Sequence, residues 1–104
     1  MKVAITSAGN TKSAHIDQRF GRCAYFALYD TTTQKLEFVE NSAKDAPEGA
    51  GPAAVAIVAN RGARKVVSVE FGMKIKTMLT DLGIQMVIMK EDKTIEELIG
   101  LIKE

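Results

Sequence analysis

The segment GPAAVAIVANRGARKVVSV, residues 51–69, decides the fold class of this chain. Its proline stands in the first turn of a predicted helix, where the missing N–H leaves no hydrogen bond unmade. Residues 53–59 are almost wholly apolar, which predicts a buried helix, and Gly62 can adopt the left-handed conformation that ends it. The β-branched run over 65–69 then predicts a strand. A helix followed at once by a buried strand is typical of an α/β protein.

The same alternation continues to the C-terminus. Gly72 precedes a helix whose apolar residues recur at i, i+3, i+4 and i+7, which predicts one core-facing side. Residues 85–89 predict the last strand. Thr94, followed three residues later by Glu97, has the spacing of a capping box at the start of a third helix. The predicted core residues are Ile75, Met78, Leu79 and Leu82 in the second helix, and Ile95, Leu98, Ile99 and Ile102 in the third.

Upstream of residue 51, the apolar residues follow a period of two. Residues 2–6 predict a short buried strand, and residues 24–30 and 35–39 alternate between two faces. The polar stretch 31–34 between them predicts an antiparallel hairpin. We therefore expect one domain over residues 1–104, with the order β-β-β-α-β-α-β-α and a mixed five-stranded sheet carrying three helices. This layout is similar to the ribonuclease H-like fold.

The charge and the cysteine count exclude several classes of function. Fourteen Lys and Arg against thirteen Asp and Glu give a net charge of +1, too small to favour nucleic acid or anionic lipid as partners. Apolar runs are too short for a membrane span or a secretory signal, so we expect a cytoplasmic protein. Cys23 is the only cysteine, which excludes an intrachain disulfide and a Cys-only metal site within one copy. The nearly neutral charge leaves both a monomer and a weak homodimer open.

Three segments are expected to meet beyond the carboxyl ends of the parallel strands, where α/β sheets bind ligands. They are the loop 7–22, the approach to the first helix at 48–52, and the strand-to-helix joint at 70–73. Glycines in the second and third segments would let the backbone approach a ligand closely, and a helix start favours an anion. The same glycines could equally serve only as caps and turns. They are Gly49, Gly51 and Gly72.

The stretch DQRFGRCAYF, residues 17–26, has the most informative side chains. Arg19 and Arg22 offer planar, forked donors suited to a multiply charged, sulfide- or oxo-rich anion. Cys23 could ligate iron, copper or molybdenum as a soft thiolate, or could be a small buried hydrophobe. His15 in the preceding loop could be a metal ligand or simply an exposed histidine.

These residues resemble a known family. The pattern Asp17-x-Arg19-Phe20-Gly21-Arg22-Cys23-x-Tyr25-Phe26, followed by Tyr29-Asp30, is similar to the opening motif of the nitrogenase iron-molybdenum cofactor biosynthesis family, which includes small free-standing members. Weaker similarities follow in order along the whole chain. They are Glu40-Asn41, Gly49-Ala50-Gly51, Gly72, Leu82-Gly83-Ile84 and Lys93-Thr94-Ile95-Glu96-Glu97.

The resemblance implies a ribonuclease H-like domain that binds an iron-molybdenum cofactor, a precursor or another metal-sulfur cluster without turnover. By position, it implies that the cofactor-binding residues are Arg19, Gly21, Arg22 and Cys23, together with the loop from Gly49 to Gly51. The chain also departs from the family pattern. Arg19 replaces a histidine found in one branch, and Ala46-Pro47-Glu48 stands where many members have histidines.

Our first hypothesis is a non-catalytic carrier of a metal-sulfur cluster, iron-molybdenum or iron-sulfur, that exchanges it with donor or acceptor proteins. Cys23 would anchor the cluster, with His15 as a second candidate ligand, while the arginines and the helix-start amides stabilise its charge. The alternative is a metal-free module that binds an anion or a partner protein. A nuclease is disfavoured because Glu37 is the only carboxylate in the interior of the predicted strands, and metal-dependent phosphoryl chemistry needs several. We therefore expect no enzymatic activity.

Overall fold

The computed structural model describes residues 1–102, which form a single α/β domain. Within that range a mixed five-stranded sheet carries three helices, as the sequence predicted. No helix in these residues has the length and apolar character that a membrane span requires. In chain order the elements are β1 (Lys2–Ser7), β2 (Tyr25–Asp30), β3 (Leu36–Glu40), α1 (Ala50–Asn60), β4 (Ala63–Ser68), α2 (Met73–Asp81), β5 (Gln85–Ile88) and α3 (Ile95–Ile102).

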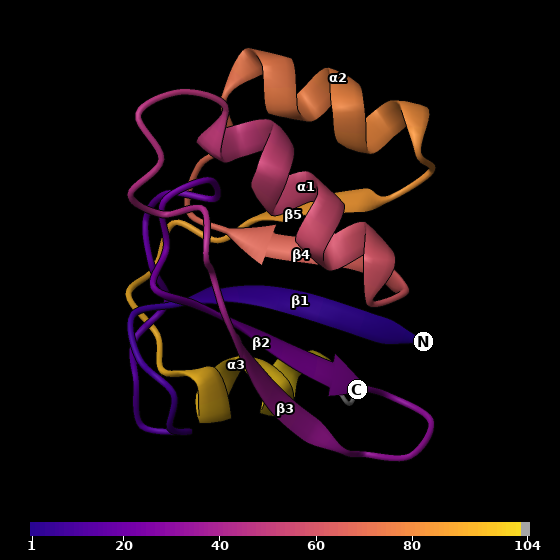
Figure 1. The fold of residues 1–104 in the computed structure, drawn as a ribbon. Coiled ribbons are helices and arrows are strands. Elements are labelled where there is room, and N and C mark those ends of the chain that lie inside the picture. The colour runs from indigo at the N-terminus through magenta and orange to yellow at the C-terminus, as the bar shows by residue number, and fades with distance from the viewer. Residues whose placement is uncertain (103–104) are drawn as a thin grey trace.

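The sheet is built around β1, and its strand order is β3-β2-β1-β4-β5 (Figure 1). β1 pairs antiparallel with β2 and parallel with β4, so that Ile5 lies between Ala27 and Val67. β3 extends the antiparallel side and β5 the parallel side. Because β1 has a strand on each edge and helices on both faces, every residue of β1 after Lys2 is buried.

Helices cover both faces of the sheet. α1 and α2 lie together on one face and α3 lies on the other (Figure 1). The predicted alternation in β2 is confirmed, because Phe26 and Leu28 pack in the cluster under α1 and α2, whereas Ala27 packs in the cluster under α3. Burial on both faces explains why the strand is apolar at nearly every position.

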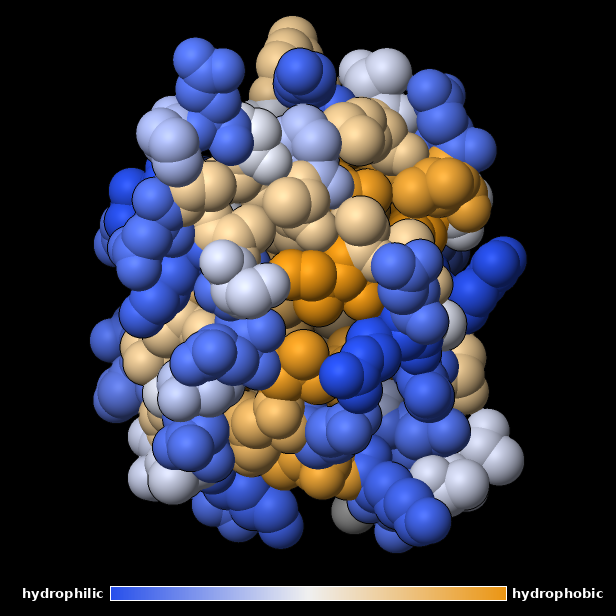
Figure 2. All heavy atoms as spheres, in the orientation of Figure 1, coloured by the Kyte–Doolittle hydropathy of each residue, from blue (hydrophilic) through white to orange (hydrophobic). Residues whose placement is uncertain are grey.

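Three burial predictions were wrong in part. α1 is not fully buried, because it lies on the outside of its sheet face with Ala53 and Ala56 exposed. Figure 2 shows apolar residues gathered over this face, around α1. Leu82 is 51% exposed because α2 ends at Asp81 and Leu82 is only its C-cap residue. In α3, Ile95 and Leu98 are buried, but Ile99 and Ile102 are only half-buried near the edge of the face.

The predicted helix ends are confirmed. The backbone N–H of Thr94 donates to Glu97 Oε1 at 2.9 Å, and the backbone N–H of Glu97 donates to Thr94 Oγ1 at 3.2 Å, which completes the capping box. Gly62 after α1 and Gly83 after α2 have φ angles of 81° and 72°. This left-handed conformation is strained for residues with a Cβ, so both helices end where the sequence indicated.

A close contact between two backbones joins the loop before β2 to the start of α1. A Cβ placed on Gly21 would lie 3.0 Å from the Cα of Gly51 and 3.2 Å from its nitrogen. Both neighbouring atoms belong to the backbone and cannot rotate away. The contact therefore requires glycine at position 21.

We expect Gly21→Ala to reduce the free energy of unfolding by about 1–3 kcal/mol, because the added methyl group must push the loop away from α1. Urea unfolding followed by circular dichroism measures this change. Gly100→Ala in α3 is the matched control, since the added carbon would meet no atom within 4 Å among the described residues, apart from its chain neighbours and the adjacent backbone of its own helix. Equal stability of the two variants would show that the loop yields without cost.

Candidate functional site

The loop after β1 crosses the carboxyl ends of two neighbouring strands. It leaves the sheet at Ser7 and returns beside β1, where the N–H of Asp17 donates to the carbonyl of Thr6 at 2.9 Å. It then passes the end of β4, where the N–H of Glu70 donates to the carbonyl of Gln18 at 3.1 Å. Arg19 and Glu70 form a parallel bridge at this point. The loop is thus held by backbone hydrogen bonds at the edge where α/β sheets bind ligands.

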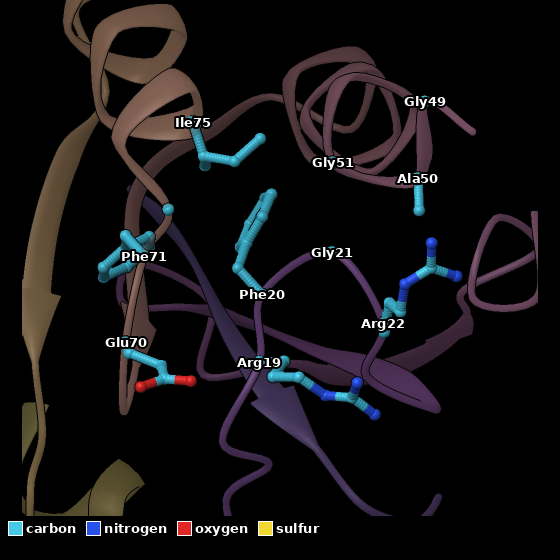
Figure 3. Close-up of a pocket in the computed structure, with 11 residues that line it drawn as sticks. Arg19, Phe20, Gly21, Arg22, Gly49, Ala50, Gly51, Glu70, Phe71 and Ile75 are labelled. Carbon is cyan, nitrogen blue, oxygen red and sulfur yellow. The ribbon is translucent and has the colours of Figure 1, made fainter. Parts of the chain in front are cut away.

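A cavity of about 590 Å³ opens where this loop meets the starts of α1 and α2 (Figure 3). The three segments that the sequence analysis expected to converge all contribute to it. Of the predicted site residues, Arg19, Gly21, Arg22, Gly49, Gly51 and Gly72 line the cavity, whereas Cys23 and His15 do not. The other lining residues are Phe20, Ala50, Glu70, Phe71 and Ile75.

The inner wall of the cavity is apolar. The rings of Phe20 and Phe71 lie 5.9 Å apart between centroids, and the side chain of Ile75 points from α2 into the same space (Figure 3). All three side chains are buried. Phe20 and Phe71 lie within segments predicted to border the site, but none of the three was predicted as a site residue, because apolar residues in such positions are usually core residues.

The two arginines are held differently. Arg22 Nη1 donates to the carbonyl oxygens of Lys44 at 2.9 Å and Ala46 at 3.0 Å, so this guanidinium is anchored to the loop before α1. Arg19 is exposed, and its guanidinium has no hydrogen bond or ion pair within residues 1–102. The cavity therefore has one fixed cation and one that is free to rotate.

Two helix starts add positive potential. Gly49 precedes α1 and Gly72 precedes α2, and neither start has a side-chain cap or an acidic residue in its first turn. The first amide groups of a helix lack intrahelical partners and carry partial positive charge. Because both helices begin at the cavity wall, these amides complement the arginines as donors to an anion.

Asn41 holds the loop around the site together, and the sequence analysis did not single it out as a site residue. Its side chain is buried, and Nδ2 donates to the carbonyl oxygens of Gly21 at 3.0 Å and Cys23 at 2.9 Å. Its Oδ1 accepts from the N–H of Ala43 at 3.1 Å. In the sequence, Asn41 appears only in the Glu40-Asn41 match of the family resemblance. An asparagine after a strand usually marks a turn, so its residue type alone does not indicate a role at the site.

The thiol of Cys23 lies in the core. The side chain is fully buried, and Sγ donates to the carbonyl of Phe20 at 3.4 Å. Burial raises the pKa of the Cys23 thiol from its ordinary value of 9.0 to about 12, with a further contribution from the negative charge of Asp17. The thiol is therefore neutral at physiological pH, whereas a metal ligand is a thiolate.

His15 also lies apart from the cavity. It is exposed, and its Nδ1 is 2.9 Å from Asp92 Oδ1 in the loop before α3. Its backbone pairs with Thr94. Within the described residues, no group of three or more His, Cys, Asp or Glu side chains is placed to hold a metal ion.

The fold and the cavity define a small α/β domain with a basic, partly apolar cavity at the carboxyl edge of its parallel strands. A family model described as dinitrogenase iron-molybdenum cofactor matches residues 1–104, and the chain belongs to this family. The resemblance read from residues 17–26 is thus confirmed.

Known proteins of similar sequence and structure agree with this membership. An uncharacterized protein of Methanocaldococcus jannaschii is 29% identical over 107 residues, covering 100% of this chain and 86% of that protein. The apo form of the orange protein from Desulfovibrio gigas superposes with a TM-score of 0.90 at 28% identity, covering 97% of this chain and 85% of that one. A NifB-like protein from Thermotoga superposes with a TM-score of 0.84 at 32% identity, with the same coverage.

We expect the free energy of unfolding to fall between pH 9 and 12 by about 1.4 kcal/mol per pH unit through Cys23 alone. The unfolded thiol ionises near its ordinary pKa of 9.0, whereas the folded thiol keeps its proton until about 12, so rising pH favours the unfolded chain. Urea unfolding at several pH values between 8 and 10.5 measures the slope. Cys23→Ala should remove this part of the slope, and parallel slopes for the two proteins would contradict the assignment.

Proposed function

We propose that this protein binds an anionic metal-sulfur cluster in the cavity between Arg19, Arg22 and the starts of α1 and α2, and carries it without catalysing a reaction. One observation supports this most strongly. Two arginines and two uncapped helix starts surround a single cavity, while the described residues provide no set of metal-ligating side chains. Such a cavity suits a complete cluster that brings its own sulfide ligands, rather than a bare metal ion.

The balance of charge supports an anionic cargo. Arg19 and Arg22 contribute two positive charges and Glu70 one negative charge at the wall. Each helix start adds roughly half a positive charge. The sum is about +2, which would complement a small cluster of two or three negative charges. The apolar wall of Phe20, Phe71 and Ile75 would contact the polarizable sulfides and exclude water.

The size of the cavity is adequate for such a cargo. Pockets for small molecules span about 300–1,000 Å³, and this one is about 590 Å³. The orange protein structure is of an apo form, which is consistent with a fold of this kind taking a bound group. The sheet, antiparallel on one side of β1 and parallel on the other, also supports the ribonuclease H-like layout implied by the family resemblance.

The role of Cys23 in this proposal differs from the one that the sequence suggested. A direct metal-thiolate bond would require the core around Cys23 to open and a thiol with a pKa of about 12 to lose its proton. We therefore propose that Cys23 is a packing residue, and that ionic contacts and hydrogen bonds at the wall hold the cluster. The partners would be proteins that donate or accept the cluster, as membership of a cofactor family implies.

A second candidate function is a metal-free module that binds an inorganic or organic anion. The same arginines and helix starts would recognise any compact anion of suitable charge. The burial of Cys23 favours this alternative, since it removes the thiol from the candidate metal ligands. The two candidate functions differ in one testable respect, because only a cluster carrier should retain a pre-formed metal-sulfur cluster when the apo protein is titrated with it.

Anaerobic titration of the apo protein with pre-formed iron-sulfur or molybdenum-sulfur clusters separates these candidates. Gel filtration, metal and sulfide analysis and a visible spectrum then report what is bound. Stoichiometric retention by the wild type and by Cys23→Ala, with weaker retention by Arg19→Gln, is the expected result. Arg61→Gln is the matched control, because Arg61 is exposed at the end of α1 and pairs with Glu37, away from the cavity. Retention that requires Cys23 would restore the thiolate as anchor, and retention by no variant would leave the anion-binding module.

We expect Gly72→Asp to weaken cluster binding at least about fivefold, because it places a negative charge beside the cargo. Position 72 accepts a side chain: φ is −66°, and an added Cβ would lie 4.0 Å from Ile75 Cγ1. Aspartate is also a good N-cap residue, so α2 should be retained. Gly72→Asn has nearly the same size without the charge, and should bind close to wild type. Equal losses in the two variants would indicate a steric effect instead.

A further inference from the structure

Glu70 is the one acidic side chain on the wall of a cavity whose other charged groups are cationic. It is exposed, and its carboxylate has no hydrogen bond or ion pair with any of residues 1–102. A carboxylate in this position opposes the binding of an anion. Glu70 would therefore lower, not raise, the affinity of the cavity for an anionic cargo.

Glu70 and Arg19 are neighbours through the backbone. They form a parallel bridge, which places their Cα atoms about 5 Å apart with side chains on the same face. In this structure the Arg19 guanidinium is turned away from the Glu70 carboxylate (Figure 3). A rotation of the Arg19 side chain would bring the two charges together, because nothing in the described chain holds that guanidinium. Arg22, by contrast, is anchored to Lys44 and Ala46.

We propose that Glu70 competes with the bound anion for Arg19 and so keeps the cargo exchangeable. This inference rests on the proposed function, since it assigns regulation to the same cavity. With cargo bound, Arg19 contacts the anion. When the cargo leaves, Arg19 pairs with Glu70, so the cation is not left unpaired and release costs less free energy. Glu70 is thus a residue that sets affinity and release rate and makes no bond to the metal.

If Glu70 competes for Arg19, removal of its charge in Glu70→Gln should change both affinity and release rate. This variant should bind the anion about two- to fivefold more tightly and release it more slowly, which corresponds to the loss of one solvent-screened ion pair. The gain should depend on Arg19, so that Glu70→Gln in an Arg19→Gln background changes affinity much less. A double-mutant cycle over the two positions therefore measures the competition itself.

The experiment uses two probes on the full chain. Sodium sulfate, titrated at constant ionic strength and followed by NMR chemical shifts of the Gly49, Gly51 and Gly72 amides, reports anion affinity. A pre-formed iron-sulfur or molybdenum-sulfur cluster, with release into a chelator followed by absorbance, reports affinity and release rate for the proposed cargo. Glu96→Gln is the matched control, since Glu96 is an exposed glutamate of α3 on the opposite face of the sheet.

The outcomes separate this inference from the proposed function. Tighter binding and slower release in Glu70→Gln, dependent on Arg19 and absent in Glu96→Gln, support the inference. If the wild type retains the cluster but Glu70→Gln leaves affinity and release unchanged, the inference is overturned and the carrier function stands. If Glu70→Gln binds more weakly, Glu70 contacts the cargo directly and competition is excluded. If only sulfate shows the Arg19-dependent gain, the competition holds and the metal-sulfur cargo does not.

Discussion

The backbone contact between Gly21 and Gly51 is the constraint on which the cavity depends. It brings the loop after β1 against the first turn of α1, with no room for a methyl group between them. Asn41 fixes the same loop from behind, through the carbonyl oxygens of Gly21 and Cys23. Arg22, which lies between Gly21 and Cys23 in the loop, donates to the carbonyl oxygens of Lys44 and Ala46. Hydrogen bonds between loops thus give this rim of the cavity the rigidity that a strand or helix would otherwise supply.

This rigidity matters for an ionic site. A charge that is already held in place loses little conformational entropy on binding, so its electrostatic attraction is converted more fully into affinity. Arg22 and the two helix starts are of this kind, whereas the Arg19 guanidinium has no hydrogen bond or ion pair within residues 1–102. The cavity therefore combines a preorganised cationic surface with one mobile cation, an arrangement suited to binding and release within one site.

The sequence predicted most of the fold and part of the site. The spacing of apolar residues and the residue types at helix ends located the strands, the helices and the capping box, because these features depend on interactions between residues close in sequence. The meeting of three segments around the cavity was also expected, because in an α/β topology the loops that follow parallel strands lie together at the carboxyl edge of the sheet. The roles of individual side chains were not accessible. For Cys23 the sequence left a metal ligand and a buried core residue both open, and burial in the structure supports the second. Anchoring of Arg22 and the bridge between Arg19 and Glu70 depend on contacts between segments remote in sequence, and periodicity carries no information about them.

The burial of Cys23 also bears on what kind of carrier this fold can be. A cluster bound through a thiolate must break a covalent metal-sulfur bond before it is transferred. A cluster held only by ionic contacts and hydrogen bonds, as proposed here, would have no such bond to break. Because the Cys23 thiol is buried and its pKa is raised to about 12, the proposed carrier would take up and release its cargo without forming or breaking a bond to sulfur of the chain.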